Sequence, residues 1–224
     1  GWELSGPAHF ITHALTASHC LVIANEGGER AAFLVDMNDC LVPAKYQSTD
    51  DRTLRLSNIT FHGSQALRLE SVGEKQIDDA LHLALIALAG EQVGGMRAMF
   101  KITIQYLNTR FQFGEPIGRF QALKHMAADL LVDVESASTV ARIAAQTMAS
   151  GSGDSELLTY LAAFTCADNF RKVTADAIQL HGGIAYTMEH PAHLYWRRAQ
   201  TGQWLYASSD KLRDLYLLEM EAKL

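Results

Sequence analysis

The sequence predicts an α+β fold, in which a partial β-barrel or sheet domain is followed by a C-terminal helical bundle. Short β-prone runs separated by turn residues occupy residues 1 to about 72. From about residue 74 onward, apolar residues recur every three or four positions instead. A hydrophobic content of 48% is enough for a buried core in each part. These observations divide the chain into a β domain at 1–72 and a helical domain at 73–224.

The β domain is expected to contain several short strands. Gly27 and Gly28 stand between two of them and predict a hairpin turn, because glycine adopts the positive φ angles that tight hairpins require. The candidate strands are His9–Thr12, Leu21–Ala24, Ala31–Val35, Thr53–Leu56 and Ile59–Phe61.

The helical domain is expected to contain three long amphipathic helices. The first is predicted to end at Phe113–Pro116, and the next break falls at Gly151–Asp154, where Asp154 or Ser155 could cap the third helix. The third is interrupted by Gly182-Gly183, and shorter helices follow from Pro191. Helices of roughly 30 residues are about 45 Å long. Their apolar stripes predict a bundle with short connections.

Composition narrows the possible functions. The net charge of −6 gives no reason to expect nucleic acid or an anionic membrane as a partner. No apolar run approaches the roughly 20 residues of a membrane span, and the first residues do not resemble a signal peptide. The three cysteines, Cys20, Cys40 and Cys166, are far apart, which fits the reducing cytoplasm better than a disulfide framework.

The junction between the first two helices could bind a phosphate group. Arg110 offers a planar fork of donors, Gly114 permits a close approach, and Gln121 begins a helix whose free N–H groups favour an anion. The alternative is an ordinary interhelical turn with a surface arginine, and spacing alone favours that alternative.

The segment after the third helix is the second candidate. Gly182 and Gly183 first of all indicate a helix C-cap, but they would also let a nucleotide approach the backbone closely. The nearby His181, His190 and His193 lack the spacing of a zinc motif, so no metal site is expected.

Taken together, three segments resemble the acyl-CoA dehydrogenase family. The segment from Arg110 reads RFQFGEPIGRFQ and resembles the family signature RxxFGxPI followed by FQ. The segment from Gln179 reads QLHGGIAYTMEHP and resembles the second signature, at the separation that the family shows. The segment His9–Thr12 resembles the strand that faces the flavin.

The resemblance covers essentially the whole chain and implies a fold. The chain is similar to the last strands of the family's middle β domain and to all of its C-terminal domain, an up-and-down bundle of four-helix type. The family's N-terminal helical domain has no counterpart here. We expect that this domain was lost or that another chain supplies it.

The resemblance also implies an FAD cofactor. By this resemblance Thr12 would hydrogen-bond the flavin ring near its reactive nitrogen, and Phe10 would pack against the ring. The remaining positions would contact the diphosphate and adenosine of an FAD from a neighbouring subunit, so a dimer or tetramer is implied. They are Arg110, Phe113, Gln121, Gln179, Gly183 and, as a looser match, Ser208.

The implied reaction is α,β-dehydrogenation of an acyl-CoA thioester, with an electron-transfer flavoprotein as acceptor. A carboxylate must remove the α proton. The two positions where the family carries this glutamate are Tyr206 and Ala84, and neither residue can take a proton as a carboxylate does. Glu91 is a candidate substitute seven residues after Ala84, on nearly the same helix face but about 10 Å away. A paired structural carboxylate is the other interpretation of Glu91, and Asp210 is expected to cap the last helix.

Two functions therefore stay open. The chain is either an active FAD-dependent acyl-CoA dehydrogenase subunit that uses Glu91 or a non-catalytic partner that completes the FAD site of a second chain. The ending Ala207-Ser208-Ser209-Asp210 resembles the bacterial heteromeric enzymes, some of which act on steroid side chains, more than the usual Glu-Gly-Thr ending.

Overall fold

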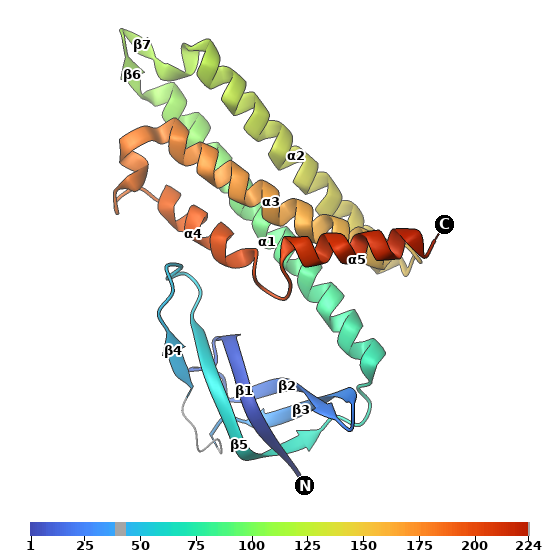
Figure 1. Ribbon diagram of the computed structural model, residues 1–224. Coiled ribbons are helices and arrows are strands. Elements are labelled where there is room, and N and C mark those ends of the chain that lie inside the picture. The colour runs from blue at the N-terminus through green and yellow to red at the C-terminus, as the bar shows by residue number, and fades with distance from the viewer. Residues whose placement is uncertain (39–43, 224) are drawn as a thin grey trace. The chain divides into compact units, whose positions relative to one another are not determined.

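The computed structural model describes residues 1–38 and 44–223, so Cys40 lies outside the described residues. The chain forms two compact units, Gly1–Leu81 and His82–Leu224 (Figure 1). The first unit is built on a sheet and the second on helices, which confirms the predicted α+β fold. Helix α1 (Glu74–Thr109) begins in the first unit and continues into the second. The domain boundary placed between residues 72 and 73 stays a prediction.

In the described part of the first unit, antiparallel strands form a curled sheet in the order β1-β5-β3-β2, and β4 pairs with β5. Strand β5 pairs with β1 along its length and with β3 only near its end, at Leu67 and Arg68. The sheet therefore curls into the predicted partial barrel. The strands are β1 (Trp2–Thr12), β2 (His19–Glu26), β3 (Glu29–Asp36), β4 (Lys45–Gln47) and β5 (Leu56–Arg68).

The local chemistry explains where the strands begin and end. Gly27 and Gly28 have φ angles of 64° and 107°, which confirms the predicted hairpin turn between β2 and β3. The predicted strand Thr53–Leu56 is wrong, since only Leu56 belongs to a strand. The carboxylate of Asp51 accepts hydrogen bonds from both the N–H and the hydroxyl of Thr53, and this local bonding holds the segment in a turn.

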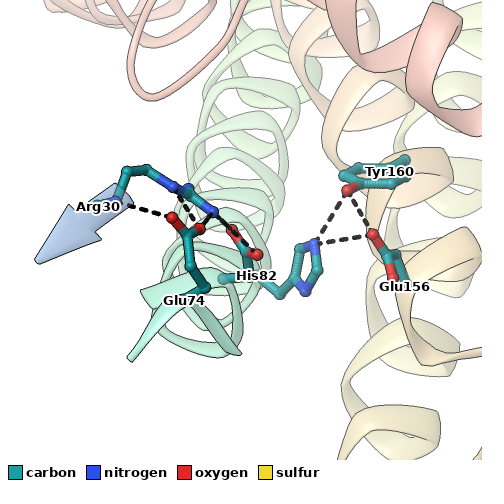
Figure 2. A network of polar contacts seen from close by, with 6 residues as sticks. Arg30, Glu74, His82, Glu156 and Tyr160 are labelled. Carbon is teal, nitrogen blue, oxygen red and sulfur yellow. Dashed lines mark hydrogen bonds and ion pairs between the residues drawn. The ribbon is translucent and has the colours of Figure 1, made fainter. Parts of the chain in front are cut away.

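The sheet has its own hydrophobic core. Alternate strand residues, including Phe33, Val35, Ile59 and Phe61, are buried together. Arg30 on β3 also binds Glu74 in the first turn of α1 through its N–H and its guanidinium group, as Figure 2 shows. The hydrogen bonds from the Arg30 side chain lower the pKa of the Glu74 carboxyl. These contacts fix the start of α1 on the sheet of the same unit.

The described part of the second unit contains long and short helices joined by short connections, as predicted. After α1 they are α2 (Gln121–Ser150), α3 (Ser155–His181), α4 (Ala192–Gly202) and α5 (Ser209–Glu221). A small hairpin of β6 (Phe111–Gln112) and β7 (Glu115–Pro116) and a 3₁₀ turn, η1 (Ile117–Arg119), join α1 to α2. A second 3₁₀ turn, η2 (Gly182–Tyr186), follows α3.

Helices α1, α2 and α3 run alongside one another (Figure 1), and their apolar residues form the core of the second unit. Met96, Leu130 and Val173 are fully buried there. At Gly95 a Cβ atom would lie 2.6 Å from the ring of Phe170, so glycine is what lets α3 approach α1 this closely. None of the helices in the described part of the chain is long and apolar enough to cross a membrane.

Two predicted helix caps are wrong. Asp154 occupies the N-cap position of α3, but its side chain makes no capping hydrogen bond and instead lies 2.7 Å from the ammonium group of Lys223. At α5 the cap is Ser208, whose hydroxyl accepts a hydrogen bond from the N–H of Lys211 at 3.3 Å, rather than Asp210. In the case of Asp154 a contact with the far end of the chain outcompetes the local cap.

Candidate functional site

The junction between α1 and α2 is a tight hairpin with an unusual tip. Phe113 and Gly114 have φ angles of 55° and 84°, as a two-residue hairpin turn requires. Such an angle is strained for phenylalanine, and the Phe113 side chain is 91% exposed. A strained and exposed aromatic residue is typical of a position that contacts a ligand or another subunit.

The junction is fixed to the end of α1 through backbone contacts. The N–H of Ile117 donates to the carbonyl of Arg110 at 2.8 Å. At Gly118 a Cβ atom would lie only 2.9 Å from the carbonyl oxygen of Leu107, so glycine is required where the turn crosses α1. Sequence reasoning missed this role of Gly118, although a glycine just before a helix start is a signal for a close approach.

The start of α2 is suited to an anion. Gln121 is the first residue of α2, and the N-cap residue Phe120 makes no side-chain capping hydrogen bond. The first N–H groups of the helix are therefore not satisfied by a cap, and they carry the positive end of the helix dipole. Arg110 forms no ion pair among the residues that the structure describes. An arginine fork and uncapped amides in one junction fit the donor set that a diphosphate needs.

The end of α3 is the second candidate segment. Gly182 has a φ angle of 64° and terminates the helix, which confirms the interruption predicted at the diglycine. Gln179 and Gly183 are exposed, and a Cβ atom built at Gly183 would meet no atom within 4 Å. Tyr186, in the same segment, is 79% exposed. The backbone here is open to close approach by another molecule.

Two aromatic rings bring these segments together. Tyr106, four residues before Arg110, lies against His181, which directly precedes Gly182, with ring centroids 4.6 Å apart. Figure 1 shows the β6–β7 hairpin and the C-terminal end of α3 at the same end of the bundle. The structure therefore gathers Arg110, Phe113 and Gln121 at the same end as Gln179 and Gly183.

His181 is a packing residue at this contact rather than a metal ligand. Its Nδ1 lies 2.7 Å from the carbonyl oxygen of Ala177, so Nδ1 carries the proton and donates it. Burial lowers the pKa of His181, although this hydrogen bond opposes the shift, and the neighbouring His190 lowers the pKa slightly further. No group of three His, Cys, Asp or Glu side chains in the described part of the chain could hold a metal ion.

Phe10 and Thr12 lie in the first unit, at the irregular end of β1. The pairing of β1 with β5 shifts register between Ala8 and Ile11, and Phe10 adopts a φ angle of 56° there. The N–H of Phe10 donates to the side-chain oxygen of Asn58 at 2.9 Å, which stabilises the bulge. Phe10 is 59% exposed, so its ring is presented outward from the strand.

Glu91 lies on α1, well away from the junction. It is 19 residues before Arg110, or about 28 Å along the helix. Its carboxylate accepts a hydrogen bond from Nε of Arg198 on α4 at 2.7 Å. This contact joins α1 to α4, so the geometry assigns Glu91 a structural partner that sequence reasoning had not identified.

The two positions where a carboxylate was expected lack one. Ala84 lies on α1, and Tyr206 lies in the turn between α4 and α5, where it has a φ angle of 67° and is 62% exposed. The next residue but one, Ser208, caps α5.

A polar network joins α1 to α3 close to Ala84. Nε2 of His82 lies 3.0 Å from the Tyr160 hydroxyl, which itself donates to Glu156 at 2.8 Å (Figure 2). Because the single hydroxyl proton of Tyr160 is donated to Glu156, Nε2 of His82 carries the proton in its contact with the Tyr160 oxygen. Tyr160 also packs with Leu85 beside Ala207, so this network supports the turn that contains Tyr206.

Three comparisons with known proteins agree with the family resemblance of the sequence. The family model for the acyl-CoA dehydrogenase C-terminal domain matches residues 72–215. Acyl-CoA dehydrogenase IpdE2 of Mycolicibacterium smegmatis is 36% identical over 173 residues, which cover 77% of this chain and 51% of that protein. The chain therefore spans about half the length of this curated relative.

Solved structures share the fold over the whole chain. The Tcur3481-Tcur3483 steroid acyl-CoA dehydrogenase has a TM-score of 0.91 at 26% identity, covering 100% of this chain and 60% of that one. The ChsE4-ChsE5 complex from Mycobacterium tuberculosis also has a TM-score of 0.91, at 23% identity, over 99% of this chain and 60% of that one.

Proposed function

Because this chain belongs to the acyl-CoA dehydrogenase family, we propose that it is part of an FAD-dependent enzyme that dehydrogenates an acyl-CoA thioester between its α and β carbons. One observation carries the proposal. The contact between Tyr106 and His181 places the arginine-bearing junction and the diglycine segment at one end of the bundle. An extended dinucleotide needs both segments at once, the first for its diphosphate and the second for its adenosine.

The residues at this end are suited to an FAD that belongs to a neighbouring subunit. Arg110 and the uncapped amides at Gln121 bind the diphosphate, while Gln179 and the open backbone at Gly183 contact the adenosine. The strained and exposed Phe113 packs against the same cofactor. Ser208, the looser match to the family, caps α5. We do not assign it a contact with the cofactor.

Phe10 and Thr12, in the first unit, are the proposed contacts of the flavin ring. The outward ring of Phe10 would pack against the flavin, and the hydroxyl of Thr12 would donate a hydrogen bond to it. FAD, when bound, accepts the hydride that leaves the β carbon. We also propose an electron-transfer flavoprotein as the electron acceptor and the cytoplasm as the location of the reaction.

The acyl group is that of a fatty acid or a steroid side chain. The steroid acyl-CoA dehydrogenase among the solved structures supports the second of these substrate classes.

A second function is favoured by the ion pair of Glu91. A general base must reach the α proton, but Glu91 is bound to Arg198, and the family's base positions hold Ala84 and Tyr206. This chain would then complete the flavin site of a second acyl-CoA dehydrogenase chain that supplies the base. The ChsE4-ChsE5 neighbour, a complex of two different chains, has the same fold.

Purification from the native host tests the flavin site. The tagged chain should elute with FAD, and an Arg110→Gln variant should lose most of it. Arg171→Gln is the matched control, because it removes the same charge from an exposed position on α3. Equal flavin content in the two variants would contradict the proposal.

The same purification identifies any second chain. If the tagged chain alone holds a full complement of flavin and turns over acyl-CoA, the role as a non-catalytic partner is excluded. If a second dehydrogenase chain co-elutes and turnover requires it, that role is supported.

A further inference from the structure

A cavity of about 320 Å³ lies between α3, the turn η2 and α4, within the second unit. Beside it, α4 packs against α3 and η2 through buried contacts that include Ala177, Ala185 and Ala192. Sites for small molecules hold roughly 300–1,000 Å³, so this cavity is large enough for a small ligand. Neither Gln179 nor Gly183, the nearby candidates for flavin binding, is among its walls.

The apolar walls of the cavity are suited to a flat ring. The half-buried Ile178 of α3 and the buried Ala185 of η2 contribute aliphatic surface. Tyr186 of η2 and Trp196 of α4 contribute aromatic rings that are 79% and 37% exposed. Because aromatic side chains stack on planar groups, two rings on different elements favour an aromatic ligand over a flexible aliphatic chain.

Two polar side chains line the same cavity from α4. His193 and Arg197 are four residues apart, so they lie on one face of the helix with their Cβ atoms about 5–6 Å apart. Nδ1 of His193 is buried and has no hydrogen-bond partner in the part of the chain that the structure describes. A buried nitrogen without a partner is unfavourable, so a ligand group that bonds to it gains affinity.

These polar groups define the chemistry of the ligand. A hydroxyl both donates and accepts, so it can bond to Nδ1 of His193 in either tautomer of the neutral ring. The guanidinium group of Arg197 has five N–H donors, so it can bind an acid in addition to its contacts within the chain. One guanidinium fork matches the two oxygens of one carboxylate.

We propose that this cavity binds a planar aromatic carboxylate that also carries a hydroxyl. Its ring packs against Tyr186 and Trp196, its hydroxyl bonds to Nδ1 of His193, and its carboxylate pairs with Arg197. The site is separate from the flavin-binding segments, so the inference goes beyond the proposed dehydrogenase function.

Two naphthoates that differ only in a hydroxyl test the site on the purified full chain, together with any chain that co-purifies. By isothermal titration calorimetry, 6-hydroxy-2-naphthoate should bind about 5-fold more tightly than 2-naphthoate, because one neutral hydrogen bond contributes that much. His193→Phe should bind the two naphthoates with equal affinity. Trp196→Leu and Arg197→Gln should each weaken both by at least ~5-fold. Trp204→Leu is the matched control and should bind both normally, because Trp204 is 69% exposed and lies outside the cavity.

Three results would overturn the site. The unmodified protein could fail to bind either naphthoate at millimolar concentration, the advantage of the hydroxyl could persist in His193→Phe, or Trp204→Leu could weaken binding as much as Trp196→Leu. Circular dichroism checks that each variant is folded, and FAD content is measured in parallel. If FAD is retained but neither naphthoate binds, this inference is wrong and the proposed function stands.

Discussion

Replacing Glu91 by glutamine separates its structural and catalytic interpretations. The substitution keeps the size of the side chain and removes the charge that pairs with Arg198. If the residue is structural, the loss is confined to one ion pair. If it is the general base, the enzyme loses the group that removes the α proton.

The structure sets the size of the structural effect. The Glu91 and Arg198 side chains are 49% and 24% exposed, and their charged atoms lie 2.7 Å apart. Water screens a pair with this exposure, so its contribution is about 0.2–1 kcal/mol. For a chain of this size the midpoint of thermal unfolding should fall by roughly 0.4–4 °C. Removal of a general base, in contrast, typically lowers turnover by about 10²–10⁴-fold.

The assay uses the assembled protein with any chain that co-purifies. Flavin reduction by acyl-CoA is followed in a stopped-flow instrument, and unfolding is followed by circular dichroism. We expect Glu91→Gln to retain FAD, to reduce it within about twofold of the unmodified rate, and to unfold slightly earlier. Arg198→Gln should also lower the midpoint, and the double variant should lower it by less than the sum of the two single shifts, because both changes remove the same ion pair.

One result would refute this reasoning. If Glu91→Gln abolishes flavin reduction while FAD stays bound, and Arg198→Gln does not, Glu91 is the base. The ion pair would then only hold the carboxylate in place until substrate binds.

Three further predictions concern packing and titration. Gly118→Ala should lower stability by about 1–3 kcal/mol, because its Cβ would press on the Leu107 carbonyl; equal melting of Gly118→Ala and the open-position control Gly153→Ala would contradict this. Burial raises the pKa of the Cys166 thiol to about 12, so iodoacetamide at pH 8 should label it only in denaturant; rapid labelling of the native protein, detected by mass spectrometry, would show that the thiol is accessible. The pKa of His181 is lowered in the folded state, so the unfolded chain binds more protons and stability should fall as the pH drops below about 6.5. His181→Phe should flatten this dependence in urea titrations at pH 7 and pH 5, and an unchanged slope would contradict the assignment.

Local sequence signals predicted most elements of the fold. The periodicity of α1, α2 and α3 and the diglycines at Gly27 and Gly182 act over a few residues, and the structure agrees with them. Two predictions, the strand at Thr53–Leu56 and the helix cap at Asp154, failed because another interaction competed with the predicted one. Asp51 held the segment around Thr53 in a turn through its own side chain. Lys223 drew the Asp154 carboxylate away from the helix it was expected to cap, across 69 positions of the chain.

The candidate flavin-binding residues were also chosen from the sequence, because their motifs are short and contiguous. Their roles stay predictions until flavin binding is measured. The sequence did not identify Arg198 as the partner of Glu91, because Arg198 follows 107 positions later, on another helix. The close approach at Gly118 likewise depends on the Leu107 carbonyl, and no pattern within the signature identifies that neighbour.

The sequence by itself determined which residues form helices, strands and turns, and it placed the arginine-bearing junction and the diglycine at the ends of two helices. Only the tertiary structure decided that these ends meet, through Tyr106 and His181, and that Glu91 is held by Arg198. Propensity and turn chemistry act between neighbours along the chain. Contacts between distant segments depend instead on the lengths of whole helices and on how their side chains pack.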